Sequence, residues 1–119
     1  MAYIDGYVLA VPTANKEAYR EMAKLGQTVF KDHGALQVME TWGEDVPQGK
    51  VTSFPMAVKC KDDETVVFSW VIWPSKEARN TGMKKSMEDP RMQIDPATMP
   101  FDGKRMIFGG FKTMMEFGA

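Results

Sequence analysis

The sequence is poor in the residues that most often build metal sites and covalent cross-links. Its 119 residues include one cysteine, Cys60, and one histidine, His33. A lone cysteine cannot close an internal disulfide or form a cysteine metal cluster. Nothing in the sequence pairs with His33 as a metal set or a catalytic triad would require. We therefore expect no disulfide and no bound metal.

An excess of basic residues is also missing. Fifteen Lys and Arg residues oppose 16 Asp and Glu residues, which leaves a formal net charge of −1. Such a chain lacks the positive field that attracts a phosphate backbone, so we expect no nucleic-acid partner. The RNA-recognition motif shares the element order derived below, but its basic-Gly-aromatic signature is absent from residues 65–73.

Long hydrophobic runs are absent as well. No apolar stretch approaches the roughly 20 residues that cross a bilayer, so no membrane partner is expected. The first five residues, MAYID, have no basic segment followed by an apolar run and a cleavage site. From these features we predict a cytoplasmic protein of bacterial type.

What remains is the composition of one globular domain, over residues 1–119, with 44% hydrophobic and 26% charged residues and no repeat or linker. Methionine is the exception, with 11 residues, seven of them from Met83 onward. A thioether copper site or an adaptable binding surface would use them, but flexible core filler is the commoner role. Met83 and Met87, four residues apart, fit the core stripe of a helix.

Hydrophobic periodicity and turn residues divide the chain into alternating strands and helices. A helix is expected from a cap at Thr13 or Asn15 to His33, with Gly34 just past its end. A second helix is expected from a cap at Ser75 to a point before Pro90. Strands are expected over residues 3–11, 35–43, 53–60, 65–73 and 105–117. Residues 91–104 are expected to form an ordered loop or a short helical turn. Gly109 and Gly110, inside the last strand, indicate a bulge or a close backbone approach.

This order is that of an α+β, ferredoxin-like split βαβ fold: an antiparallel sheet, two helices on one face and one extra strand at 53–60. Residues 65–73, TVVFSWVIW, carry apolar side chains at both odd and even positions, so both faces of this strand are apolar. Helices on one face would leave roughly 1,000 Å² of large apolar side chains exposed on the other, more than a monomer usually shows. We therefore expect a homodimer through the sheet face, sheet against sheet.

Six segments of the chain resemble a bacterial family of unknown function, the YbaA-like proteins. They are YIDGYV at 3–8, KEAYREM at 16–22, WGEDVPQGKVT at 42–52, VFSW at 67–70, DPRM at 89–92 and MPFDGKRMIFGGF at 99–111. The resemblance covers nearly the whole chain. It implies a dimeric α/β barrel, a superfamily that also holds cofactor-free monooxygenases, haem-degrading enzymes and small isomerases.

The catalytic candidates are His33 and Asp102. His33 ends the first helix, where it could act as a general base or cap a last-turn carbonyl. Asp102 could share acid–base work with Asp45 if the fold joins their loops, although Asp102-Gly103 is also an ordinary turn dipeptide.

The substrate-binding candidates are Trp42, Asp45, Arg79 and Arg105. Trp42 could line a cavity for a flat apolar substrate, or serve as a core or interface anchor. Arg79 and Arg105 could clamp an anion, or form ordinary surface ion pairs. Cys60 is expected to be structural.

From these features we predict a cofactor-free small-molecule enzyme of monooxygenase or isomerase type. The alternative is a non-catalytic small-ligand binding or sensing module in the same barrel cavity. The sequence leaves both open, because no residue constellation in it is specific to one reaction.

Overall fold

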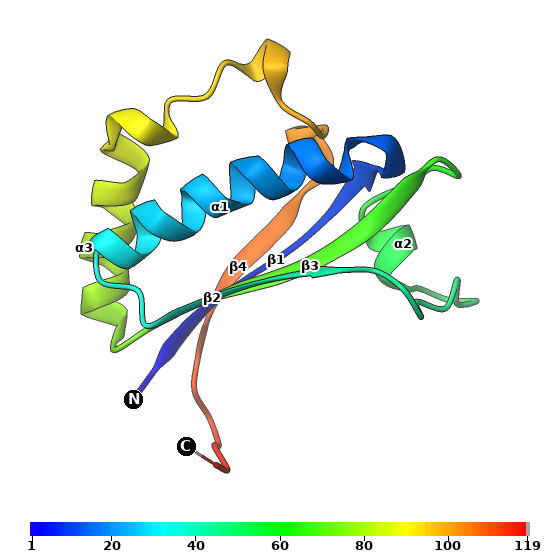
Figure 1. Ribbon diagram of the computed structural model, residues 1–119. Coiled ribbons are helices and arrows are strands. Elements are labelled where there is room, and N and C mark those ends of the chain that lie inside the picture. Colours follow the sequence, from blue (N-terminus) through cyan, green and yellow to red (C-terminus); the bar gives the residue numbers. More distant parts are fainter. Residues whose placement is uncertain (119) are drawn as a thin grey trace.

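The computed structural model describes residues 1–118 and shows one antiparallel sheet with its two long helices on one side (Figure 1). The four strands are β1 (Tyr3–Pro12), β2 (Gln37–Trp42), β3 (Glu64–Trp73) and β4 (Ile107–Lys112). Their order across the sheet is β2-β3-β1-β4. This is the predicted ferredoxin-like α+β fold, with β1 and β3 at the centre. In the described part of the chain, no helix is both long and apolar enough to cross a membrane.

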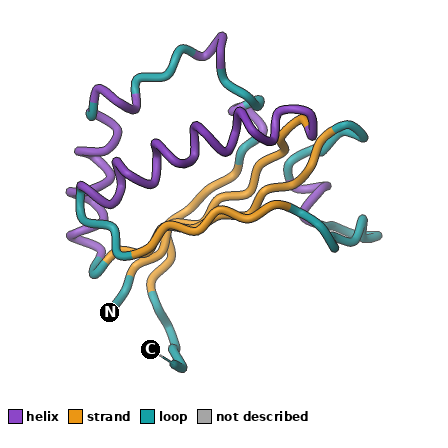
Figure 2. The backbone as a smooth tube through the Cα atoms, in the orientation of Figure 1, coloured by secondary structure: helices purple, strands orange, loops and turns teal. Residues whose placement is uncertain are grey.

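Helix α1 (Lys16–Asp32) lies diagonally across the sheet and buries Tyr19 and Val29 (Figure 2). One 3-10 turn, η1 (Thr13–Asn15), leads into it from β1. The predicted side-chain cap is not formed, because the Asn15 amide instead donates to the carbonyl of Pro100, 2.9 Å away. The end of the helix is as predicted, since Gly34 has a φ of 107°, which favours glycine.

Helix α3 (Lys76–Glu88) begins at the predicted cap, where the Ser75 hydroxyl accepts from the backbone N–H of Ala78 at 3.1 Å. The segment that follows is ordered, as expected, by three 3-10 turns: η2 (Pro90–Met92), η3 (Pro96–Thr98) and η4 (Gly103–Arg105). Each turn starts with an aspartate whose carboxylate accepts the backbone N–H two residues later: Asp89, Asp95 and Asp102. This segment, residues 89–105, closes one side of the space between the helices and the sheet and is called the roof segment below (Figure 1).

One predicted strand is not formed, and one open alternative is decided. Residues 53–60 form no extra strand but contain the short helix α2 (Phe54–Ala57). The reason is local, because Ser53 caps Met56 at 3.1 Å and Pro55 occupies the first turn, where its missing N–H costs nothing. Gly109 and Gly110 form no bulge, since β1 and β4 pair in unbroken register. The alternative, a close approach, is confirmed at Gly110, where a Cβ would lie 2.7 Å from the Tyr3 hydroxyl.

The sheet has two apolar faces, as the strand pattern predicted. Odd-numbered residues of β1 and β3 face α1 and α3, and Leu9, Val11, Tyr19 and Val67 form a buried core there. On the opposite face, the α2 segment covers only one end, where Val58 packs with Ala10 and Val66. The rest, here called the open face, consists of Ile4, Val8, Met39, Phe68, Trp70, Ile72, Ile107 and Phe111.

Candidate functional site

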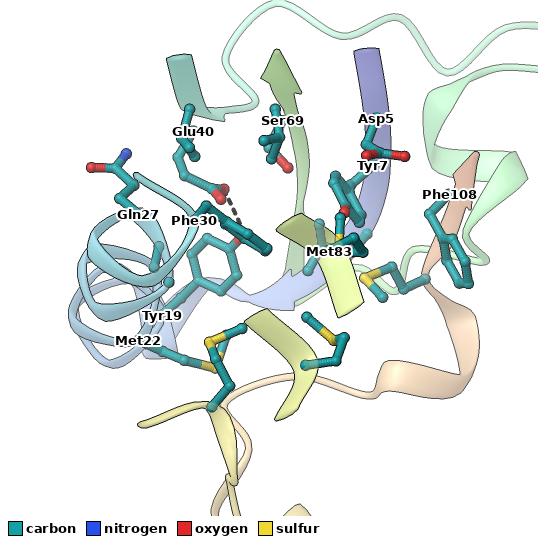
Figure 3. Close-up of a pocket in the computed structure, with 18 of the residues that line it drawn as sticks. Asp5, Tyr7, Tyr19, Met22, Gln27, Phe30, Glu40, Ser69, Met83 and Phe108 are labelled. Atoms are coloured by element: carbon teal, nitrogen blue, oxygen red, sulfur yellow. Dashed lines mark hydrogen bonds between the residues drawn. The ribbon is translucent and has the colours of Figure 1, made fainter. Parts of the chain in front are cut away.

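A cavity of about 420 Å³ lies between the sheet and the helix layer (Figure 3). Its walls are mostly apolar and come from α1, α3, the sheet and the roof segment. The apolar lining includes Leu9, Met22, Phe30, Val71, Met83, Met87, Met92, Ile94, Phe101, Met106 and Phe108. A volume of this size is typical of a site for a small organic molecule.

Five methionines line this cavity: Met22, Met83, Met87, Met92 and Met106. All but Met22 belong to the methionine-rich part of the chain that begins at Met83. Thioether side chains are flexible and polarizable, so a wall built from them can adapt to ligands of different outline. The methionine excess thus belongs partly to a binding surface and not only to core filling.

One row of side chains runs across the floor of the cavity, perpendicular to the strands. Glu40 on β2 lies opposite Ser69 on β3, and Ser69 lies opposite Tyr7 on β1. Phe108 on β4 completes the row beside Tyr7, with 6.3 Å between the two ring centroids. Adjacent strands are about 4.8 Å apart, so the Glu40 and Tyr7 backbones are separated by roughly 10 Å.

Glu40 is a carboxyl group in an apolar cavity. The phenol of Tyr19 on α1 donates a hydrogen bond to its Oε1 at 2.7 Å. Burial raises the pKa of the Glu40 carboxyl, and the neighbouring hydroxyls of Tyr19 and Ser69 oppose that rise. Burial and then the Glu40 charge raise the pKa of Tyr19, so this phenol stays a donor. A raised pKa makes the Glu40 carboxylate a stronger base than an exposed glutamate.

Tyr7 presents a second phenol to the cavity. Burial, followed by the charge of Asp5, raises the pKa of Tyr7 to about 12. Within the described residues, its hydroxyl has no hydrogen-bond partner, and the side chain lines the cavity between Ser69 and Phe108 (Figure 3). A neutral phenol in this position can donate to a carbonyl or hydroxyl oxygen of a ligand.

Arg79 lines the same cavity but is held by a buried carboxylate. Its Nη2 lies 2.8 Å from Asp5 Oδ1, and its Nε also donates to that carboxylate. The indole N–H of Trp73 donates to Asp5 Oδ2 at 3.0 Å, and the guanidinium stacks over Tyr3 with 5.1 Å to the ring centroid. The pairing with Asp5 raises the pKa of Arg79. This network fixes the end of the cavity floor beside α3.

Of the six residues predicted for the site, only Arg79 lines this cavity. His33 pairs with Asp89, with 2.9 Å between Nε2 and Oδ2. Asp89 is also bound by Arg91, and Arg91 and then His33 lower the pKa of its carboxyl. The His33 side chain thus joins the end of α1 to the start of the roof segment.

Asp102 and Arg105 lie together, but outside the cavity. Arg105 Nε donates to Asp102 at 3.1 Å, and its Nη2 lies 2.6 Å from the buried carboxylate of Glu64. The backbone N–H of Lys104, and then Arg105, lower the pKa of Asp102. This arrangement is an ion-pair network that ties η4 to the start of β3.

Trp42 and Asp45 share a small hollow at the other end of the sheet, separate from the main cavity. Trp42 packs against the core beside Leu9 and Val67, and the ammonium of Lys16 lies 5.3 Å from its ring centroid. Asp45 is exposed in the loop that follows.

His33, Trp42, Arg79 and Asp102 therefore do not converge on one cavity. Over residues 1–118, no three His, Cys, Asp or Glu side chains are placed to hold a metal ion.

Sequence reasoning missed Glu40, Tyr7, Tyr19 and Ser69. One signal for Glu40 was present: it is two residues from both Val38 and Trp42, so the acid shares their helix-facing side of the strand. The row with Ser69 and Tyr7 could not be read in the same way, because it depends on the register of two strand pairs.

The chain matches a family model described as a protein of unknown function, DUF1428, over residues 2–103. It is 54% identical over 116 residues to the uncharacterized protein YbaA of Escherichia coli strain K12, which covers 98% of this chain and 99% of that one. YbaA of Shigella flexneri matches to the same extent.

Among solved structures, the chain resembles a mutant of SnoaB, a cofactor-independent oxygenase from Streptomyces nogalater. The TM-score is 0.61 over 99% of this chain and 98% of SnoaB, with 13% sequence identity. At this identity the likeness shows the fold alone. The full-length match to YbaA and the family model together place the chain in the DUF1428 family of YbaA-like proteins.

Proposed function

We propose that this protein is a cofactor-free small-molecule enzyme in which Glu40 removes a proton from an apolar substrate held in the main cavity. One observation carries the proposal: a carboxyl with a raised pKa stands in an apolar cavity, hydrogen-bonded to Tyr19. A base whose pKa lies closer to the working pH transfers protons more effectively.

The row on the cavity floor supports a defined arrangement of the substrate. A carbonyl compound with its oxygen at Tyr7 would place an adjacent acidic C–H toward Glu40. The Tyr7 phenol, which remains protonated, would donate to the oxygen as negative charge develops on it. The methionine and aromatic walls favour a flat, largely apolar molecule.

Both predicted reaction types share this first step. The Glu40 carboxylate takes the proton, and the C–H electron pair becomes an enolate. In an isomerase, Glu40 returns the proton to a different carbon of the same substrate. In a monooxygenase acting on a CH₂ group, the enolate reacts with O₂, one oxygen atom stays as a carbonyl, and the other leaves as water with the two hydrogens. The substrate then supplies all the electrons.

The test is hydrogen–deuterium exchange at the α-carbon of 2-tetralone in D₂O, followed by NMR. This flat ketone carries an acidic C–H beside its carbonyl. We expect the protein to accelerate exchange and the Glu40→Gln variant to lose at least 100-fold of that acceleration. The matched control is Glu44→Gln, the same change at an exposed carboxyl outside the main cavity. Equal exchange by both variants would refute a role for Glu40.

The second candidate function is non-catalytic ligand binding in the same cavity, supported by the unpartnered Tyr7 hydroxyl and the adaptable methionine wall. Binding of 2-tetralone, measured by calorimetry, without any acceleration of exchange would favour this function. In either case we expect Tyr7→Phe to weaken binding several-fold, because the ligand oxygen loses a hydrogen bond.

We also propose that the working unit is a homodimer formed through the open face, in the bacterial cytoplasm. Large apolar side chains support it: Phe68 is 43% exposed and Phe111 is 62% exposed. A second copy placed sheet against sheet would cover them. We expect sedimentation to show a dimer at micromolar concentration and Phe68→Glu to give a folded monomer. A monomeric parent protein would overturn this assembly.

A further inference from the structure

The C-terminal tail, residues 113–118, leaves β4 with several large apolar side chains in solvent. Met114 is 89% exposed, Met115 is 84% exposed and Phe117 is fully exposed. Soluble domains do not usually present three large apolar side chains within four positions. The protomer's own surface gives these side chains no cover.

The start of the tail is fixed, which sets its direction. Both the backbone N–H and the hydroxyl of Thr113 donate to the carbonyl of Ala2, the latter at 2.6 Å. From this anchor the tail turns away from the helix layer, toward the side of the open face (Figures 1 and 2). It therefore points to where a second protomer would lie in the dimer proposed above.

The length of the tail suffices for it to reach that protomer. Six extended residues span up to roughly 20 Å, whereas two sheets packed face to face lie about 10 Å apart. A tail from one protomer can thus cross the interface and lie against the other. A two-fold axis would give both protomers the same exchange.

The apolar area also favours a role for the tail in the interface. On the open face Phe68, Phe111, Ile107 and Met39 are exposed, and Phe54 and Met56 of α2 are exposed beside it, with the Phe54 ring next to Phe68. At about 200 Å² for a large side chain, the exposed parts of these six total roughly 600 Å². The three tail side chains offer roughly as much again. A stable interface buries about 800 Å² on each partner, and the tail roughly doubles the exposed apolar area that these side chains offer toward that value.

We propose that residues 113–118 pack on a second copy of this chain and that this exchange of tails stabilises the dimer. The inference rests on the dimer through the open face. The exchanged tail is a second contact between the protomers, in addition to the contact between the sheets. Met114, Met115 and Phe117 are its anchoring side chains.

The first test compares dimer dissociation by analytical ultracentrifugation. We expect the triple variant Met114→Ser, Met115→Ser, Phe117→Ser to dissociate at a concentration at least tenfold higher than the parent chain does. Its circular dichroism should not change, because the three side chains are exposed in the protomer. The control is Glu116→Gln, which alters a polar side chain of the same tail and should leave dissociation unchanged.

The second test identifies what the tail touches. A photoreactive benzoyl-phenylalanine at position 117, in dimers of tagged and untagged chains, should cross-link one chain to the other. Cross-links confined to a single chain would overturn the proposal by showing a tail folded on its own protomer. If the triple variant dissociates like the parent while Phe68→Glu is monomeric, the dimer stands and the tail exchange fails. A monomeric parent refutes both.

Discussion

The phenol of Tyr19 on α1 donates a 2.7 Å hydrogen bond to the carboxylate of Glu40 on β2, so the longest helix and an edge strand meet at one half-buried acid. The contact bridges the helix layer and the sheet at the wall of the main cavity (Figure 3). It satisfies part of the hydrogen-bonding capacity of a carboxyl whose pKa is raised by burial.

The first prediction concerns this carboxyl and pH. The pKa of Glu40 is higher in the folded than in the unfolded protein, so the folded protein binds the carboxyl proton more tightly. The stability that this proton contributes is fully present below the unfolded pKa and is lost as pH rises through the folded pKa. The stability of the parent relative to Glu40→Gln should therefore fall with rising pH, by about 1.4 kcal/mol for each pKa unit of difference. Urea titrations from pH 4 to pH 8 measure this. A relative stability that rises with pH would show that Glu40 is stabilised as an anion.

Glu64 should show the opposite dependence. Hydrogen bonds from Arg105 lower the pKa of this carboxyl from 4.5 to about 2, and only 4% of the side chain is exposed. Its contribution is present above the unfolded pKa and is lost as pH falls from about 4.5 to about 2. We expect Glu64→Gln to remove on the order of 2 kcal/mol at pH 7 and nothing at pH 2. Thermal melts across that range check it, and an equal loss at both pH values would mean a packing effect instead.

A pair of glycine substitutions tests how α3 packs. A Cβ at Gly82 would lie 2.3 Å from the Trp73 ring and 2.5 Å from the carbonyl oxygen of His33, so α3 would have to move. At Gly26 in α1 the nearest atom is 4.0 Å away. Alanine is favoured over glycine in a helix by about 1 kcal/mol, so Gly26→Ala should raise the melting temperature. Gly82→Ala should lower it by several degrees, and a rise at both sites would contradict the close packing.

His33 and Asp102 were predicted as catalytic residues, and their neighbours suggest how to test that prediction. His33 joins α1 to Asp89 at the start of the roof segment. If this pair is structural, His33→Ala should lower the melting temperature and leave 2-tetralone exchange per folded molecule unchanged. Asp102→Asn should behave in the same way, because Asp102 binds Arg105 outside the cavity. Loss of exchange at native stability would restore the catalytic prediction for the substituted residue.

Local chemistry alone determined much of this protein. The strand at residues 65–73, the cap at Ser75 and the end of the first helix at Gly34 follow from side-chain type and spacing. The two apolar faces of the sheet could be read from the same alternation. The strand predicted for residues 53–60 failed because Ser53 and Pro55 favour a helical turn more strongly than the apolar residues favour a strand.

Tertiary structure decided the site. Glu40, Ser69 and Tyr7 form a row only because β2, β3 and β1 pair in one register, and a shift of one residue would turn these side chains to the open face. His33, Arg79 and Arg105 pair with Asp89, Asp5 and Glu64, which are all far from them in sequence and could not be predicted from spacing. Only the pair of Arg105 with Asp102, three residues away, is local. The charged residues that the sequence predicted for a site mostly form ion pairs that connect separate segments of the chain. A charged side chain that folding removes from water is stable only beside an opposite charge.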